Sequence, residues 1–271
     1  MEKEKLLDIK DLSVTYKTED GIVYAVNNLN LTLEPKETLG FVGETGAGKT
    51  TTAMTIMGLL PTPPGKVTSG EIMFDGKDML KIGDKERRGI LGEKISMIFQ
   101  DPMTSLDPVM RIGPQVEESL RIHTRMNALE RRAAALSAME EAELRDPEIV
   151  YEKYPHELSG GMLQRAMIAA AVVARPKLLL LDEPTTALDV TIQAQILELL
   201  KKLNRESGIS MLFISHNLNV VRKLCTRTAV MQRGVLVEEG DIETVFRHPR
   251  HPYTQRLIAA IPTRHRKEET P

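Results

Sequence analysis

Residues 43–50 read Gly-Glu-Thr-Gly-Ala-Gly-Lys-Thr and match the pattern G-x-x-x-x-G-K-[ST] at every fixed position. The apolar stretch 38–42 leads into this run like a buried strand, and residues 51–60 can follow it as a helix. Glycines let the backbone curl tightly enough to aim several N–H groups at one phosphate chain. The positive end of the helix dipole also favours an anion at that place. The sequence therefore predicts a strand–loop–helix unit that binds a nucleoside triphosphate.

Two side chains of this loop are expected to act on the triphosphate directly. The Lys49 ammonium would reach the β- and γ-phosphates, and the Thr50 hydroxyl would be a ligand of Mg²⁺. A glycine-rich turn that binds nothing is the alternative, but both flanks and all the fixed positions favour the phosphate loop. We expect the remaining contacts to come from the rest of the run and the next residue, at Gly43, Glu44, Thr45, Gly46, Ala47, Gly48 and Thr51.

Length and composition exclude several other classes of protein. A chain of 271 residues can bury a large core, and 41% hydrophobic with 27% charged residues is ordinary for a globular protein. The net charge of −2 gives no reason to expect nucleic acid as a partner. Cys225 is the single cysteine, which excludes an internal disulfide framework. We expect no signal peptide at the charged N-terminus, and no apolar run approaches the ~20 residues of a membrane helix.

The hydrophobic pattern predicts an α/β chain with a helical insert. Residues 6–42 alternate apolar and polar positions, which favours β-structure. Residues 104–174 are rich in helix formers such as Ala, Glu and Leu, and prolines interrupt them near 113–114, 146–147 and 154–155. The apolar run 178–181 is typical of a strand that is covered on both faces. Residues 191–206 then carry the single apolar stripe of a helix that the following glycine would end.

Two acids follow the strand at 178–181. Ligands of open α/β sheets bind at the carboxyl ends of the strands, so Asp182 and Glu183 are expected beside the phosphate loop. Asp182 would hold the Mg²⁺ shell, and Glu183 would orient or deprotonate the attacking water. An isolated pair of this kind would more often be exposed surface acids, but the loop at 43–50 favours the catalytic interpretation.

Two further polar side chains follow short apolar strands. Gln100 comes after 95–99, and His216 comes after 211–215. Each would therefore lie at the same edge of the sheet as the acids. His216 could contact the γ-phosphate, and Gln100 is placed in the same manner, but the spacing alone leaves a structural role open for both.

A second candidate anion site lies far from the phosphate loop in the sequence. Ser159, Gly160 and Gly161 precede a helix-like run at 162–174. A serine followed by two glycines makes a helix start with free N–H groups. The residues alone leave two interpretations open, which are a helix cap and a site for the phosphate of a second molecule.

In order and spacing, these elements resemble those of the ATP-binding cassette (ABC) ATPases. The resemblance covers residues 6–262, and Leu-Ser-Gly-Gly at 158–161 is its specific element, because other P-loop NTPases lack it. It implies an α/β fold with a RecA-like mixed-sheet core, an N-terminal antiparallel β-subdomain and an inserted helical subdomain. It also implies a single ATPase domain at 1–262, with the β-subdomain and phosphate-loop core at 6–103, the helical subdomain at 104–174 and the continued core at 175–240. Residues 241–271 would form a C-terminal helical and basic tail.

The family also implies a dimer that sandwiches ATP between its subunits. The residues at 159–161 would then serve the ATP of the partner subunit. Asp189 would lie in the loop that communicates across the dimer, and Gln100 in the loop that senses Mg²⁺ and the transmembrane partner. Tyr16 stands where the family stacks an aromatic ring on adenine, with a half-buried strand tyrosine as the alternative.

Further segments narrow the resemblance to the oligopeptide, dipeptide and nickel importers, and to the D-type member of their ATPase pair. These segments are 57–60, 97–108, 182–196, 251–254 and 260–262. Leu163 departs from the pattern, since arginine is usual beside the ATP-facing signature, and it leaves the strength of the partner's site open. Many D-type members hold an iron–sulfur cluster in a cysteine-bearing extension, and with Cys225 alone we expect none here.

The resemblance implies the ATP-hydrolysing motor subunit of a bacterial importer for di- or oligopeptides. Its partners would be two transmembrane permease subunits, a second ABC ATPase that is more often a paralogue than a copy, and indirectly an extracytoplasmic solute-binding protein. The chain would lie peripherally on the cytoplasmic face of the cell membrane. Nickel or another small solute is the alternative cargo within the same subfamily.

A soluble ABC ATPase of DNA repair or translation is the alternative from another class. Such proteins usually carry two cassettes, a coiled coil or zinc-binding cysteines, whereas this chain has one phosphate loop and one cysteine. A GTPase is disfavoured because the chain contains no Asn-Lys-x-Asp motif.

The C-terminal tail is locally basic, with Arg247, Arg250, Arg256, Arg264, Arg266 and Lys267. These residues would form either a solvated tail or a contact with anionic lipids or a partner.

Overall fold

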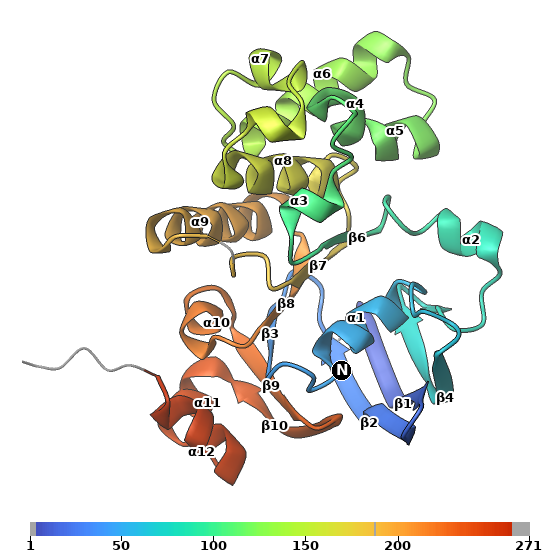
Figure 1. Ribbon diagram of the computed structural model, residues 1–271, viewed down its shortest axis with the longest axis vertical. Helices are drawn as coiled ribbons and strands as arrows, with labels where there is room; N and C mark the ends of the chain where they lie inside the picture. Colours follow the sequence, from blue (N-terminus) through green and yellow to red (C-terminus); the bar gives the residue numbers. More distant parts are fainter. Residues whose placement is uncertain (1–3, 187, 262–271) are drawn as a thin grey trace, which may run out of the picture.

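The protein is built on a mixed and an antiparallel β-sheet (Figure 1). The computed structural model describes residues 4–186 and 188–261. In spatial order, the described strands of the mixed sheet are β10 (Val235–Asp241), β9 (Arg227–Gln232), β3 (Thr38–Val42), β8 (Ser210–Ser215), β7 (Leu178–Asp182) and β6 (Ile95–Ile98). Those of the antiparallel sheet are β2 (Gly21–Leu33), β1 (Leu7–Thr18), β4 (Gly65–Phe74) and β5 (Lys77–Asp78).

The mixed sheet is parallel from β9 to β6, and β10 adds an antiparallel edge. Its β7 strand shows why the run at 178–181 is apolar throughout. Leu179 and Leu181 pack into one hydrophobic core, whereas Leu178 and Leu180 pack into another on the opposite face. Successive side chains of a strand point to opposite faces, so an unbroken apolar run indicates burial on both. The predicted doubly covered strand is confirmed.

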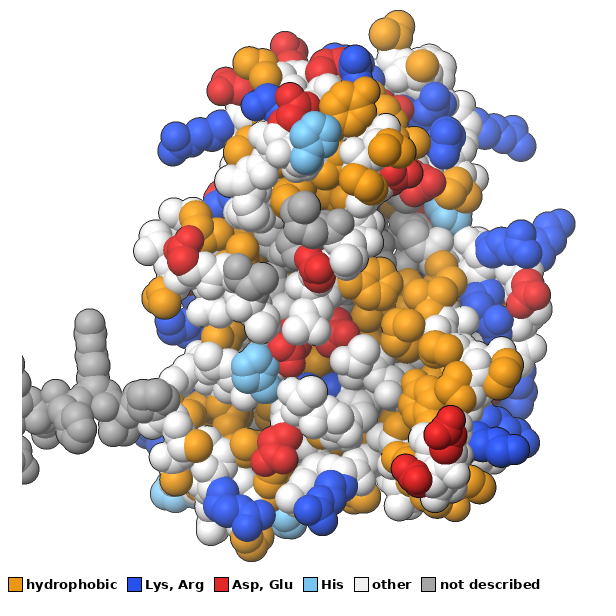
Figure 2. Space-filling view, viewed as in Figure 1, with side chains coloured by type: hydrophobic (Ala, Val, Ile, Leu, Met, Phe, Trp, Pro, Cys, Tyr) orange, Lys and Arg blue, Asp and Glu red, His pale blue; other side chains and the backbone are white. Residues whose placement is uncertain are grey.

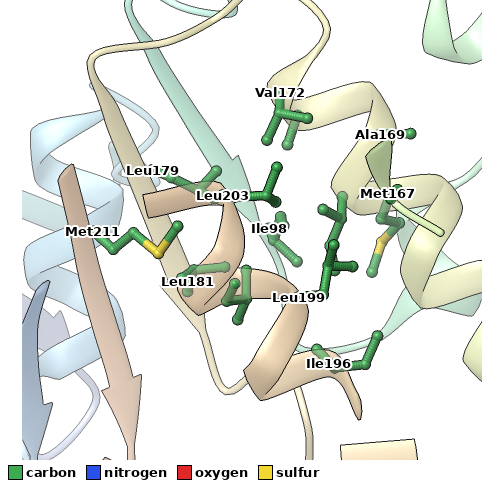
Figure 3. Packing of buried hydrophobic residues seen from close by; sticks show 14 of the residues in the cluster. Ile98, Met167, Ala169, Val172, Leu179, Leu181, Ile196, Leu199, Leu203 and Met211 are labelled. Atoms are coloured by element: carbon green, nitrogen blue, oxygen red, sulfur yellow. The ribbon is translucent and has the colours of Figure 1, made fainter. Parts of the chain in front are cut away.

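Two helices, α8 (Gly160–Val172) and α9 (Val190–Ser207), cover one face of the mixed sheet. Figure 3 shows their side chains meeting those of the strands, among them Ile98, Leu179, Leu181, Met211, Met167, Val172, Ile196, Leu199 and Leu203. The helix predicted at 191–206 is therefore confirmed, and it ends at Gly208, whose φ of 67° is left-handed. Burying a large aliphatic side chain stabilises a fold by roughly 1.5–3 kcal/mol, so this core holds the helices to the sheet.

Short helices fill the segment between β6 and β7, at the top of Figure 1. They are α3 (Pro102–Ser105), α4 (Ile112–Val116), α5 (Glu118–His123), α6 (Ala128–Glu141), α7 (Pro147–Tyr151), a 3₁₀ turn (Pro155–Glu157) and α8. The interruption predicted near 113–114 lies just before α4 instead. Pro114 stands in the first turn of that helix, where a missing N–H removes no helical hydrogen bond.

The remaining described helices flank the sheets. They are α1 (Lys49–Ile56), α2 (Asp84–Arg88), α10 (Leu218–Leu224), α11 (Ile242–Arg247) and α12 (Pro252–Ala259). The helix predicted at 51–60 is shorter, because Gly58 adopts a left-handed φ of 66° just after α1 ends. Within the described ranges no helix has the length and apolar character needed to cross a membrane. The end of the predicted basic tail, 262–271, lies outside the described residues.

Candidate nucleotide-binding site

The phosphate loop joins β3 to α1, as the sequence predicted. Gly48 has a φ of 107°, and a Cβ atom there would lie 2.1 Å from the Ala25 carbonyl oxygen of β2, so only glycine fits. Gly46 has a φ of 80°, and a Cβ atom there would meet nothing within 4 Å. The loop is therefore packed against β2 at Gly48 and is open at Gly46.

Lys49 is buried although it carries a charge. Its Nζ donates hydrogen bonds to the Gly43 and Glu44 carbonyl oxygens, at 2.7 and 3.0 Å. Burial lowers the pKa of Lys49, although the carboxylates of Glu183, Asp182 and Glu44 act in the opposite direction. The ammonium is therefore held by carbonyl oxygens of its own loop and is poorly hydrated, which favours pairing with an anion.

Thr50 and Asp182 meet at the carboxyl end of β7. The Thr50 hydroxyl donates a 3.1 Å hydrogen bond to Oδ1 of Asp182. Burial raises the pKa of Asp182, and the bond from Thr50 opposes that rise. Adjacent oxygen ligands of octahedral Mg²⁺ lie about 2.9 Å apart, given metal–oxygen distances of ~2.0–2.1 Å. These two oxygens could therefore hold Mg²⁺ between them with little movement.

Glu183 has a left-handed φ of 48°, which is uncommon outside glycine. A 3.0 Å hydrogen bond from its N–H to the Ile214 carbonyl oxygen holds this backbone against β8. Its Oε2 accepts a 2.9 Å bond from the Thr186 hydroxyl and lies 2.9 Å from Nδ1 of His216. The sequence placed Glu183 and His216 at the same edge of the sheet, and the structure brings them into direct contact.

A cavity of about 150 Å³ gathers eight of the predicted site residues, whereas Asp182 and His216 do not line it. Its lining residues are Thr45, Gly46, Gly48, Lys49, Thr50, Thr51, Gln100 and Glu183. Gln100, which follows β6, thus faces the same space as the loop and the acid after β7. The edge formed by the carboxyl ends of β3, β6 and β7 therefore offers an ammonium, a hydroxyl, an amide and a carboxylate to a bound phosphate chain.

The predicted signature lies apart from this cavity. Ser159 is the N-cap of α8, and its hydroxyl accepts the Met162 N–H at a long 3.4 Å. A Cβ atom at Gly160 would meet nothing within 4 Å. The signature instead borders a separate cavity of about 870 Å³, which is lined by Glu143, Leu144, Arg145, Ser159, Gly161, Met162, Arg165, Ile192 and Gln195. Within one chain, the fold does not bring the signature to the phosphate loop.

Asp189 and Tyr16 occupy ordinary structural positions. The Asp189 carboxylate is the N-cap of α9 and accepts the N–H groups of Thr191 and Ile192 at 3.0 and 2.9 Å. Tyr16 is half-buried in β1, where it pairs with Val23 of β2. That position is compatible with both interpretations of Tyr16, as a stacking platform and as a strand residue.

Leu163 and Tyr253 lie on opposite sides of what local sequence patterns can show: the first departs from a pattern, and the second belongs to none that points to the phosphate loop. Leu163 is 2% exposed and packs in the hydrophobic core of the helical part. Leucine in place of the arginine that is usual here therefore affects core packing, and the exposed backbone at Gly160 stays open. The hydroxyl of Tyr253 accepts a 2.9 Å hydrogen bond from the Glu44 N–H of the phosphate loop. No local pattern signals that contact, because the two residues are 209 positions apart.

Comparison with known proteins identifies the family of this chain. The ABC transporter family profile matches residues 26–186, and the profile of the oligopeptide/dipeptide transporter C-terminal region matches 237–270. The oligopeptide transport ATP-binding protein OppD of Bacillus subtilis (strain 168) is 48% identical over 259 residues, which is 96% of this chain and 72% of that protein. The dipeptide transport ATP-binding protein DppD of the same strain is 46% identical, again over 96% of this chain, and over 77% of that protein.

Solved structures agree in fold. The dimeric post-hydrolysis structure of the ATP-binding cassette MJ0796, bound to ADP and Pi, has a TM-score of 0.78 and 33% sequence identity, with coverage of 87% of this chain and 98% of that one. The protein is thus an ATPase of the ATP-binding cassette class, and the predicted fold class is confirmed. The chain belongs to the ABC transporter family, in the branch that carries the oligopeptide/dipeptide C-terminal region.

Proposed function

We propose that this ATPase drives a bacterial importer of di- or oligopeptides. The observation that carries its ATPase role is the convergence of Lys49, Thr50 and Glu183 on one small cavity at the strand ends. The peptide cargo is supported by the matched C-terminal region and by relatives named for oligopeptide and dipeptide transport. Hydrolysis would be coupled to movement of a membrane permease.

Binding of ATP would begin with the Lys49 ammonium. It would exchange the Gly43 and Glu44 carbonyl oxygens, at 2.7 and 3.0 Å, for oxygens of the β- and γ-phosphates. Because Lys49 is buried, this ion pair forms where water screens it little, and it is stronger than at an open surface. Mg²⁺, held by Thr50 and Asp182, would neutralise charge on the same phosphates.

Glu183 would position and deprotonate the water that attacks the γ-phosphorus. The proton passes to the carboxylate as the water oxygen bonds to phosphorus and the bond to the β-phosphate oxygen breaks. The Thr186 hydroxyl and the His216 ring, each 2.9 Å from Oε2, would hold the carboxylate in place. Gln100 lines the same cavity and would sense the metal and the phosphate there.

A second subunit would complete each site. The N–H groups at 159–161 and the loop of Asp189 would serve the ATP of the partner, because they lie apart from the phosphate cavity of their own chain. A related cassette that was solved as a dimer with ADP and Pi supports this arrangement. ATP would contact both subunits only in the closed dimer, so its binding would shift the population toward closure.

Mixed dimers would test this assignment. We expect Ser159→Phe to block the partner's site and to spare ATP binding at Lys49 of its own subunit. If Ser159→Phe and Lys49→Ala lie on opposite subunits, both changes fall in one site, and the other site still hydrolyses ATP. If they lie on one subunit, both sites are damaged. Phosphate release from dimers of differently tagged subunits would distinguish the two arrangements. Equal rates with the changes on opposite subunits and on one subunit would contradict a site shared between subunits.

A milder change at the same position controls for loss of the helix cap. Ser159→Ala removes only the oxygen that accepts the Met162 N–H, and a weakened N-cap costs about 1 kcal/mol of stability. We expect it to keep most of the partner's turnover. A loss as large as that of Ser159→Phe would indicate that the hydroxyl, and not the space above the glycines, is what the partner's ATP requires.

An apolar groove of about 250 Å³ lies between α1, the end of β6 and the helical part. Figure 2 shows hydrophobic side chains gathered on this face, and Leu59 and Phe99 in the groove are 44% and 38% exposed. We propose that a permease segment docks there at the cytoplasmic face of the membrane. Because Phe99 adjoins Gln100 in the sequence, a segment bound there would lie next to the phosphate cavity.

Purification from native membranes tests the transport role. Tagged Glu183→Gln protein would be captured with Mg·ATP after gentle solubilisation, and its companions identified by mass spectrometry. We expect two permease chains and a second ABC ATPase, and the associated solute-binding protein would separate a peptide cargo from nickel or another solute. Recovery only with ribosomes or nucleic acid would overturn the importer and leave the ATPase standing.

A further inference from the structure

Tyr253, near the start of α12, reaches the phosphate loop from the far end of the chain. Its hydroxyl oxygen accepts a 2.9 Å hydrogen bond from the Glu44 N–H, and the residue is 2% exposed. Burial raises the pKa of the Tyr253 phenol, although the bond from Glu44 opposes the rise. The hydroxyl is therefore neutral near pH 7 and available as an acceptor.

The Glu44 N–H belongs to the same peptide group as the Gly43 carbonyl oxygen. That oxygen accepts the Lys49 ammonium at 2.7 Å. A peptide group is planar, so holding its N–H toward Tyr253 also holds its carbonyl oxygen toward Lys49. Glycine at 43 would otherwise allow this peptide to rotate with little steric restraint. The tyrosine hydroxyl thus sets the orientation of the peptide on which the ammonium rests.

Tyr253 is itself held in place by a charged group of β10. The Glu238 carboxylate accepts the N–H groups of Arg250 and His251, at 2.8 and 3.0 Å, just before α12 begins. Burial alone would raise the pKa of Glu238, but hydrogen bonds, with that from the Arg250 N–H the largest, lower it overall. The His251 ring then caps α12 by accepting the Tyr253 N–H at 3.2 Å. A carboxylate therefore fixes the turn that presents Tyr253.

We propose that Tyr253 is a positioning residue for the phosphate loop. It acts through the Gly43–Glu44 peptide and thereby preorganises Lys49 for ATP. The inference rests on nucleotide binding by this loop and goes beyond the proposed transport role. It also gives the C-terminal region a direct physical connection to the nucleotide site, through the carboxylate of Glu238 and the start of α12.

Tyr253→Phe tests this role, because it removes one oxygen atom and keeps the ring. We expect KM for ATP to rise about three- to tenfold, the effect of losing one hydrogen bond that orders the free loop. We expect kcat to change less than about twofold, since bound phosphate oxygens hold the loop once ATP is present. A purely structural role would lower the active fraction, and hence kcat, without moving KM. Steady-state hydrolysis over a range of ATP concentrations separates these outcomes.

Tyr151→Phe is the matched control. Tyr151 is also buried, and its hydroxyl contacts the Glu117 carboxylate in the helical part, away from the loop. We expect an unchanged KM for this variant, and a smaller rise in KM for Glu238→Gln, which weakens the anchor of the turn before α12. A wild-type KM for Tyr253→Phe, or an equal rise for Tyr151→Phe, would overturn the proposal. Absence of ATP hydrolysis in the unmodified protein would instead contradict the ATPase assignment.

Discussion

Glu183→Gln lowers the rate of ATP hydrolysis by about 10²- to 10⁴-fold, the range expected for loss of a positioned general base, and leaves ATP binding intact. Glutamine keeps the size of the side chain but cannot take a proton from the attacking water. Its amide can still meet the Thr186 hydroxyl and the His216 ring that contact Oε2. ATP then stays bound, and the closed dimer accumulates. Phosphate release and size-exclusion chromatography with Mg·ATP measure the two effects.

Two further substitutions make this result specific. Glu198→Gln removes an exposed carboxylate of α9 that pairs with Lys201 at 2.8 Å, and it should leave turnover unchanged. Asp182→Asn removes the proposed Mg²⁺ ligand next to Thr50, so it should impair metal-dependent ATP binding as well as turnover. A wild-type rate for Glu183→Gln would exclude Glu183 as the base. Loss of ATP binding in that variant would point to damage of the loop.

Lys49→Ala abolishes hydrolysis and weakens ATP binding by about 10- to 100-fold. This range corresponds to roughly 1.5–3 kcal/mol for a hydrogen bond to a charged group. The alanine cannot reach the β- and γ-phosphates, and it removes a positive charge that interacts with Glu183 and Asp182. Isothermal titration with Mg·ATP measures the affinity, and phosphate release measures the turnover. Unchanged turnover would contradict the assignment of 43–50 as the phosphate loop.

Without nucleotide, the stability of the same variant should gain less from a rising pH than that of the wild-type protein. Burial lowers the pKa of Lys49 below its unfolded value of 10.5, so the unfolded chain binds this proton more tightly than the folded chain. The charged lysine therefore opposes folding at neutral pH, and that penalty disappears as the pH rises toward 10.5. Thermal unfolding without nucleotide should therefore show the wild-type midpoint gaining on that of Lys49→Ala as the pH rises toward 10.5. The variant should also show a smaller rise of its midpoint on adding Mg·ATP. The same pH dependence in both proteins would contradict this expectation, and Lys201→Ala is the surface control.

Local patterns were enough to predict most elements around the site. The loop at 43–50, the strand at 178–181 and the helix at 191–206 each follow from spacing within a few residues, because glycine conformation and hydrophobic period act over that range. The sequence also predicted that Asp182 and Glu183 follow a strand, which places them at a ligand-binding edge. Helix ends follow less directly from such patterns: α1 ends at Ile56, earlier than the pattern at 51–60 predicts.

Contacts between distant segments were beyond such patterns. No period in the sequence shows that Glu183 meets His216, 33 positions away, or that Tyr253 meets Glu44, 209 positions away. These contacts depend on strand order and on how α12 packs, and each strand or helix could satisfy its own pattern in other arrangements. Local patterns alone establish that the chain has a phosphate loop, acids at a strand end and a separate signature. Which of these side chains touch depends on the packed fold, because packing sets distances that local conformation leaves free.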